Sequence, residues 1–167
     1  VKSALRCTSM QRRALLTQSL ATGVMLCFET RAFAQQPSNT ARLWRDSGHG
    51  ERLNLRGRDV NATGRPIAGA VINTRQADGH AVYTPQYAAT LVSGKDGSYR
   101  IATVLPGQYA GDKDIHVTVE HPDYNPFWET IVFKGDNSDA NRVVLEESRI
   151  KGVLVWQGRY DIKMQKP

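Results

Sequence analysis

The stretch LNLRGRDVNATGRPIAGAVINTR, residues 53–75, decides the fold class of this chain. Its two ends, 53–60 and 67–75, have the composition of short β-strands. Gly64-Arg65-Pro66 lies between them and supplies residue types that favour a chain reversal. The stretch therefore predicts two consecutive strands joined by a turn.

The same pattern continues to the C-terminus, and no amphipathic helix of convincing length interrupts it. Further strands are predicted at 87–92, 98–104, 115–120, 127–133, 142–145, 153–156 and 160–164. Asp96-Gly97 and Pro106-Gly107 mark two of the turns between them. Short strands at this spacing favour an all-β sandwich with short connecting loops. The predicted core comprises Leu55, Val60, Ile67, Val71, Ile101, Val104, Ile115, Val117, Val119, Ile131, Phe133, Val144, Leu154 and Ile162.

Residues 1–34 read as a secretory signal peptide rather than as part of the fold. Arg12 and Arg13 precede an apolar run over 14–28, and small residues at 32–34 are typical of a cleavage site. The adjacent arginines resemble a twin-arginine export signal. Residues 1–9 precede Met10 and are interpreted as upstream sequence from a mis-set start or as an extension. We expect a protein exported to the periplasm or the exterior, with a polar linker at 35–52 and one domain at 53–167.

Charge and cysteine content both change when the predicted leader is removed. The formal net charge of +6 falls to +2, because the leader holds five basic residues and one acidic residue. A mature chain of this charge, without a basic stripe, gives little support for nucleic-acid binding. The leader's apolar run is too short and too polar for a stable bilayer span, so no span is expected in the mature form. Cys7 and Cys27 both lie in the leader, which leaves no disulfide or thiolate site in the domain.

A series of landmarks along 53–164 narrows the fold and the function further than composition does. Its front half, Gly57-Arg58 followed by 64–71, is shared by many prealbumin-like modules and is unspecific. The more specific landmarks are Gln76-Ala77-Asp78, Tyr83, Asp96-Gly97-Ser98-Tyr99-Arg100, the 103–109 segment with Pro106-Gly107-Gln108-Tyr109, Ile115-His116-Val117, Phe133-Lys134-Gly135-Asp136 and Gly158-Arg159-Tyr160-Asp161-Ile162. In this order the landmarks resemble the intradiol ring-cleavage dioxygenases, and the resemblance implies a prealbumin-like or immunoglobulin-like β-sandwich.

The resemblance also implies a non-haem Fe(III) held by two tyrosines and by two histidines in a His-x-His strand. By position, Tyr109 matches one tyrosine and His116 the second histidine. Tyr83 is the best match for the other tyrosine, and Tyr87 is its rival. Asp114 stands where the first histidine is expected. The implied catalytic residues are Tyr83, Tyr109 and His116, and Asp114 joins them as a fourth metal ligand.

The chemistry of ferric iron explains why these residue types belong together. Fe(III) is a hard cation that favours anionic oxygen donors and accepts imidazole. Side chains alternate across a strand, so Asp114 and His116 face one way while Ile115 and Val117 face the core. The resemblance implies that a small catechol-type aromatic chelates the metal and reacts with O2 between its two hydroxyl-bearing carbons, with the metal as Lewis acid and template.

Two departures from the family pattern leave a second hypothesis open. Asp114 adds negative charge to a site that already holds two phenolates, which should reduce the Lewis acidity of the metal. Gly111 stands where the family commonly has an arginine beside the substrate, and Lys113 is the nearby alternative. His80 lies close to Tyr83, but its Asp-Gly-His turn favours a surface role. The alternative function is a non-catalytic exported β-sandwich that serves as a binding or accessory module, similar to transthyretin or carboxypeptidase-regulatory domains.

Overall fold

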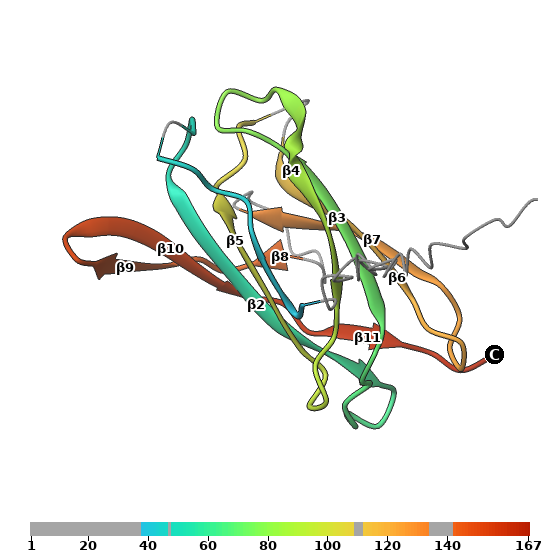
Figure 1. The fold of residues 1–167 in the computed structure, drawn as a ribbon. Coiled ribbons are helices and arrows are strands. Elements are labelled where there is room, and N and C mark those ends of the chain that lie inside the picture. The colour runs from blue at the N-terminus through green and yellow to red at the C-terminus, as the bar shows by residue number, and fades with distance from the viewer. Residues whose placement is uncertain (1–37, 47, 109–111, 134–141) are drawn as a thin grey trace, which may run out of the picture. The chain divides into compact units, whose positions relative to one another are not determined.

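The computed structural model describes residues 38–46, 48–108, 112–133 and 142–167, which all belong to one compact unit, Gln35–Pro167. The predicted leader with its two cysteines lies outside the described residues, as do Tyr109 and Gly111. The described part is built from β-strands in two sheets (Figure 1), which confirms the predicted all-β sandwich. No described helix is long and apolar enough to cross a membrane.

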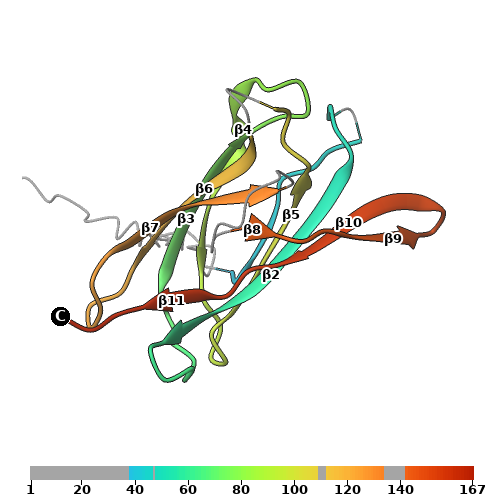
Figure 2. The same cartoon turned by 180° about the vertical axis from the view of Figure 1, so that it is seen from behind.

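The first sheet has six strands and is organised around β2. Its strands are β1 (Thr40–Arg42), β5 (Ser98–Val104), β2 (Arg52–Asn61), β10 (Val153–Arg159), β9 (Glu146–Ile150) and β11 (Ile162–Met164). Strands β10 and β11 both run parallel to β2, one after the other, and Figure 2 shows them from behind. Between them the chain crosses Gly57, where any Cβ would overlap the Tyr160 carbonyl. Glycine at 57 therefore allows two strands to share one edge of β2.

The second sheet has five strands, ordered β4 (Tyr83–Val92), β3 (Val71–Ala77), β6 (Lys113–Glu120), β7 (Phe127–Phe133) and β8 (Arg142–Val143). Neighbouring strands are antiparallel except for the short β7–β8 pair. The order places β3 and β6 at the centre of the sheet, next to each other. Because β6 carries two of the predicted metal ligands, their neighbours come from β3 and β7.

The inner faces of the two sheets form one hydrophobic core. Alternation along each strand directs apolar side chains inward, as in β6, where Ile115, Val117 and Val119 are all buried. Full burial of one such side chain contributes roughly 1.5–3 kcal/mol. The core cluster also includes Leu53, Leu55, Ile67, Ile72, Leu91, Tyr99, Ile101, Ile131, Phe133, Val143, Ile162 and Met164.

Several predicted core residues are displaced by one position. Val71 and Val144 were expected in the core, but Ile72 and Val143 are the buried members of those pairs, and the expected Leu154 is only half-buried. Val144 is 81% exposed, and Val60 is only half-buried. A strand side chain alternates between faces, so a shift of one residue moves it from the core to the solvent. The sequence of two adjacent apolar residues does not distinguish the inward one.

Two strands were not predicted from the sequence. Strand β1 lies within the expected linker and runs parallel to β5, with Ala41 buried against the core. Strand β9 pairs with β10, and their hairpin extends beyond the rest of the sandwich (Figure 1). The sequence assigned no strand to either segment, but backbone pairing to a longer neighbour stabilises both as strands.

Candidate functional site

The predicted ligands of β6 lie on the outer face of the second sheet. Asp114 and His116 alternate with the buried Ile115 and Val117, as the strand pattern predicts. The register of the sheet places Arg75 of β3 directly opposite His116 on one side. It places Thr130 of β7 opposite His116 on the other side. A row of polar side chains therefore crosses the three central strands.

Tyr83, at the start of β4, reaches this row. Its hydroxyl lies 3.1 Å from His116 Nε2, and the two rings are stacked with centroids 6.3 Å apart. The Asp114 carboxylate lies 3.9 Å from the same nitrogen. A phenol, an imidazole and a carboxylate thus meet at His116 Nε2.

The other nitrogen of the His116 ring is also engaged. Nδ1 lies 3.3 Å from the Thr130 hydroxyl. If Nδ1–H donates to that hydroxyl, Nε2 carries the lone pair and faces Tyr83 and Asp114. Such a contact fixes the ring orientation and the tautomer of a metal-binding histidine.

Tyr87, the rival of Tyr83, lies in a different environment. It is 3% exposed, and its hydroxyl packs beside Gly48. Burial raises the pKa of Tyr87, and the charge of Asp78 raises it further. The two tyrosines are separated by a bulge, since Ala77 pairs with Tyr83 whereas Arg75 pairs with Ala88. Of the two, the structure brings Tyr83 to His116.

The Gln76-Ala77-Asp78 segment holds the loops around the site. Asp78 Oδ1 accepts hydrogen bonds from the amides of His80 and Val82, each at 2.9 Å, which fixes the loop before Tyr83. The Asp78 carbonyl accepts the Gly107 amide at 2.7 Å. Asp78 therefore joins the loop that leads to Tyr83 with the turn that precedes Tyr109 in the sequence.

Gln76 and Gly107 complete this connection. The buried Gln76 amide donates to the Val104 carbonyl at 2.8 Å and so links β3 to the end of β5. A Cβ on Gly107 would overlap the Ala81 amide and lie 2.7 Å from the Gly79 carbonyl oxygen. Only glycine allows the turn and the loop to pack so closely. The motif thus has a structural role in positioning the loops around the site.

A metal at this site needs a tyrosine ligand. Among the residues that the structure describes, no group of three or more His, Cys, Asp and Glu side chains could hold a metal ion. Two donors on one ion, each bonded at about 2.0–2.2 Å, lie at most about 4.4 Å apart. The separations of 3.1 Å and 3.9 Å around His116 Nε2 meet this limit. The donor set of phenol, imidazole and carboxylate suits a hard ion such as Fe(III).

Sequence reasoning missed two residues on this outer face. The guanidinium carbon of Arg75 lies 5.7 Å from the centre of the Tyr83 ring, so a positive charge adjoins the donor set. Trp128 of β7 is 77% exposed and lies two residues before Thr130, on the same face. Arg75 directly precedes the Gln76-Ala77-Asp78 motif, but its position opposite His116 depends on strand register. The sequence alone did not specify that register.

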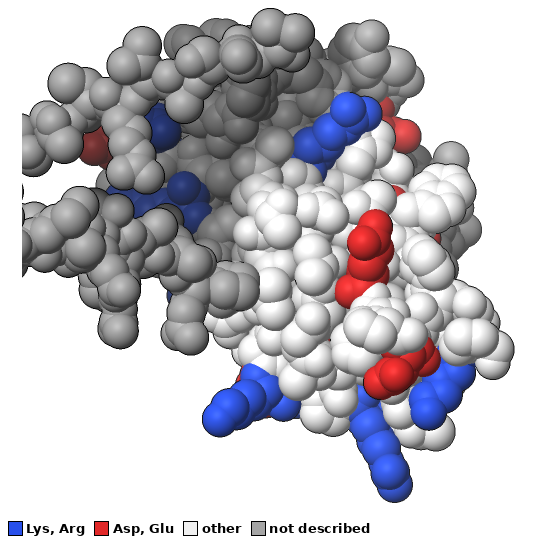
Figure 3. Space-filling model, turned by 45° about the vertical axis from the view of Figure 1, so that its right-hand side comes forward, with Lys and Arg blue, Asp and Glu red and all other residues white. Residues whose placement is uncertain are grey.

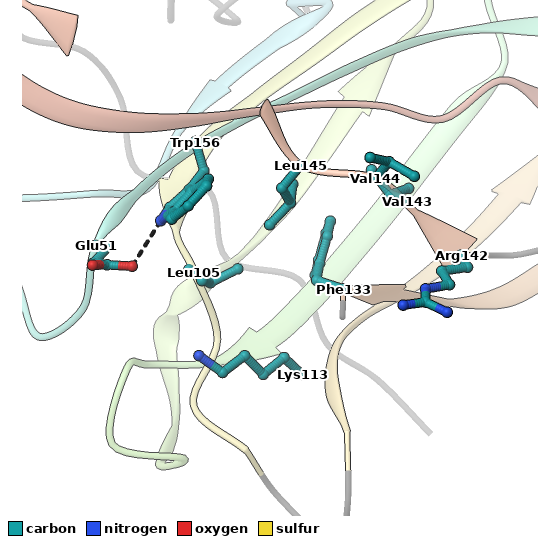
Figure 4. Close-up of a pocket in the computed structure, with 9 residues that line it drawn as sticks. All are labelled: Glu51, Leu105, Lys113, Phe133, Arg142, Val143, Val144, Leu145 and Trp156. Carbon is teal, nitrogen blue, oxygen red and sulfur yellow. Dashed lines mark hydrogen bonds between the residues drawn. The ribbon is translucent and has the colours of Figure 1, made fainter. Parts of the chain in front are cut away.

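Lys113, the alternative to the family's arginine beside the substrate, does not place its positive charge at the candidate site. Its side chain lines a cavity of about 530 Å³ (Figure 4), away from the outer face of β6 that carries Asp114 and His116. The cavity is lined mainly by apolar side chains, and Glu51 accepts a hydrogen bond from the Trp156 indole at 2.7 Å on its wall. Its lining includes none of the described candidate ligands Tyr83, Asp114 and His116.

Two histidines outside the site contact each other. His80 stacks on His49 with ring centroids 4.3 Å apart, and both side chains are exposed. This contact agrees with a surface role for His80. The third, His121, packs edge-on against Tyr124.

Comparison with known proteins identifies the family. A family model described as "Dioxygenase" matches residues 27–123. The matched segment begins inside the predicted leader and contains all four predicted ligands. A 6-chlorohydroxyquinol 1,2-dioxygenase of Cupriavidus pinatubonensis is 33% identical over 87 residues, covering 44% of this chain and 32% of that protein. The chain therefore spans about a third of this curated relative.

Solved structures show the same fold. The catechol 1,2-dioxygenase of Acinetobacter sp. ADP1 superposes with a TM-score of 0.69 at 18% identity, over 77% of this chain and 57% of that one. The dioxygenase domain of a dioxygenase carbohydrate-binding protein fusion from Streptomyces sp. SirexAA-E superposes with a TM-score of 0.68 at 21% identity. This superposition covers 78% of this chain and 89% of that one. Together with the family match over more than half of the sequence, these findings show that the chain belongs to the intradiol ring-cleavage dioxygenases, a family of oxidoreductases.

Proposed function

We propose that this protein binds a non-haem ferric ion and cleaves a catechol-type ring between its two hydroxyl-bearing carbons with O2. The observation that carries the proposal is that the Tyr83 hydroxyl and the Asp114 carboxylate both lie close to His116 Nε2. Family membership supports the reaction class. Tyr109, which lies outside the described residues, is the proposed fourth ligand.

Each ligand has a defined task in this proposal. Tyr83 and Tyr109 would supply anionic oxygens, and His116 would supply Nε2 while Thr130 holds its other nitrogen. When bound, Fe(III) would act as a Lewis acid and as a template for the two neighbouring oxygens of the substrate. Arg75 would offset part of the negative charge that two phenolates and a carboxylate bring to the site.

Substrate contacts are proposed on the same face of the sheet. Arg75 is exposed beside Tyr83, so its guanidinium can attract an anionic catecholate. Trp128 offers an exposed aromatic face to a planar ring, and such ring pairs contribute about 0.5–1.5 kcal/mol beyond area burial. We infer that a small aromatic diol binds between these two side chains.

The carboxylate of Asp114 sets the expected rate. Relative to a neutral imidazole it adds a negative charge, which lowers the attraction of the site for a dianionic substrate. We therefore propose slower turnover than in a site with two histidines. A protein that binds no iron would instead support a non-catalytic accessory module.

The two tyrosines of β4 provide a matched test of the proposal. Tyr83→Phe and Tyr87→Phe each remove one hydroxyl from the same strand, but only Tyr83 contacts His116. Iron content after reconstitution and O2 uptake with catechol should fall in Tyr83→Phe and stay near wild type in Tyr87→Phe. If both variants bind iron and consume O2 as the wild type does, the proposed site is wrong.

A further inference from the structure

Arginines are concentrated on the outer face of the first sheet. Alternation directs Leu53, Leu55 and Asp59 of β2 inward, so the arginines of that strand face outward. The six arginines of this face are Arg42, Arg52, Arg56, Arg58, Arg100 and Arg159. Figure 3 shows the side toward β6, β7 and β11, which is mostly uncharged, with acidic residues in its middle and basic residues at its lower and upper edges.

Three of these arginines stand directly opposite one another. Strand register pairs Arg56 of β2 with Arg100 of β5 on one side and with Arg159 of β10 on the other. Strands are about 4.8 Å apart, so three positive charges form a row across the sheet. Like charges in direct cross-strand positions destabilise a sheet. A row of like charges that opposes folding is expected where the charges bind an anionic ligand.

Acidic side chains neutralise only half of the cluster. Asp46, Asp96 and Asp161 lie 3.2, 4.0 and 2.8 Å from Arg52, Arg58 and Arg159, in that order. Within the described part of the chain, no acidic side chain lies at ion-pair distance from Arg42, Arg56 or Arg100. The face therefore keeps an excess of about three positive charges by this count of pairs.

Two hollows follow the arginines across the face. One, of about 560 Å³, is lined by Arg56, Arg58, Arg100 and Arg159, together with the polar residues Asn39, Thr40 and Ser98 and the acidic Asp96 that pairs with Arg58. The other, of about 260 Å³, is lined by Arg42, Arg52, Trp44 and Arg100. Arg100 lines both hollows, so they adjoin at this side chain. From Arg52 to Arg58 the strip runs along β2 for about 20 Å, at roughly 3.3 Å per residue.

We propose that this arginine strip binds a linear acidic polysaccharide, with its carboxylates on the guanidinium groups and its hydroxyls on Thr40 and Ser98. The length of the strip suits a chain with repeated charges, and guanidinium groups bind carboxylates in bidentate pairs. Trp44 already packs against the guanidinium carbons of Arg42 and Arg52, which lie 4.2 and 3.8 Å from its ring centre. It does not offer the free stacking platform that single-stranded nucleic acids use.

The test is a titration of the purified full chain with polygalacturonate, with dextran as a neutral control polymer and a single-stranded DNA oligonucleotide as a rival polyanion. Isothermal titration calorimetry should give binding to polygalacturonate that weakens as salt rises. Arg56→Glu/Arg100→Glu should lower the affinity by at least about tenfold. Arg65→Glu/Lys166→Glu makes the same change of net charge in a turn and at the C-terminal end, and it should stay within about twofold of wild type.

The possible outcomes separate the alternatives. Absence of polygalacturonate binding, or an equal loss in both double variants, would overturn the proposal. DNA binding as tight as polygalacturonate binding would overturn the choice of a saccharide. Arg56→Gln/Arg100→Gln provides a second variant if charge reversal impairs folding. The proposed ring cleavage uses residues of the second sheet, so catechol turnover of these variants should be unchanged. Polysaccharide binding and ring cleavage can therefore fail independently.

Discussion

Asp59 provides a quantitative test of the core packing. It lies on the inner face of β2 with 0% exposure, and neither carboxylate oxygen has a hydrogen-bond partner among the described residues. Burial raises the pKa of Asp59 from 3.8 to about 7. The folded protein therefore keeps a proton that the unfolded chain has already lost between these two pH values.

The magnitude follows from this difference in proton binding. Well below pH 3.8 the group is protonated in both states, so its ionisation imposes no penalty on folding. Between pH 4 and 7 the folded state binds one proton more, and stability falls by about 1.4 kcal/mol per pH unit. A shift of about three pKa units makes the total loss about 4 kcal/mol. This is a large fraction of the 5–15 kcal/mol typical of a folded domain.

The assay is urea unfolding of the wild type and Asp59→Asn from pH 4 to pH 8. The amide has nearly the volume of the carboxyl and does not titrate, so the variant should gain about 4 kcal/mol relative to the wild type across this range. Asp96→Asn is the control, because hydrogen bonds from Ser98 lower the pKa of Asp96, and its stabilising effect is lost as the pH falls. A difference between wild type and Asp59→Asn that stays constant with pH would refute the reasoning.

Three further predictions concern the site and the arginine strip. Asp114→His should raise catechol turnover by about tenfold, as measured by O2 uptake of the iron-loaded protein, because a neutral donor leaves the metal a stronger Lewis acid for a dianionic substrate; unchanged or slower turnover would contradict this. Gly107→Ala should destabilise the fold by about 1–3 kcal/mol in urea unfolding, since its Cβ overlaps the Ala81 amide; unchanged stability would show that the turn can shift. Arg56→Gln should stabilise the protein by about 0.2–1 kcal/mol at low salt, because it removes the central charge of the cross-strand row; thermal unfolding that shows no gain would count against charge repulsion.

Strand positions were largely predictable from the sequence, whereas strand pairing was not. The period of two and the turn residues gave β2, β5, β6 and β7 within two residues at each end. The inward member of an adjacent apolar pair, such as Val143 and Val144, depends on the register with a neighbouring strand. Strand β1 forms because β5 offers an unpaired edge, which its own three residues do not reveal.

In the candidate site, too, the features set by local alternation were predictable and those set by strand pairing were not. Alternation alone places Asp114 and His116 on one face. The choice of Tyr83 over Tyr87 depends on a bulge between β3 and β4, and the position of Arg75 depends on the β3–β6 register. Both are long-range features that no local sequence pattern encodes.

The most direct test of the central claim is the visible absorption spectrum and iron content of the purified protein, before and after catechol is added. The account predicts near-stoichiometric iron and a broad tyrosinate-to-iron band that shifts on catechol addition and is weakened in Tyr83→Phe. A colourless protein that stays free of iron after reconstitution would contradict it.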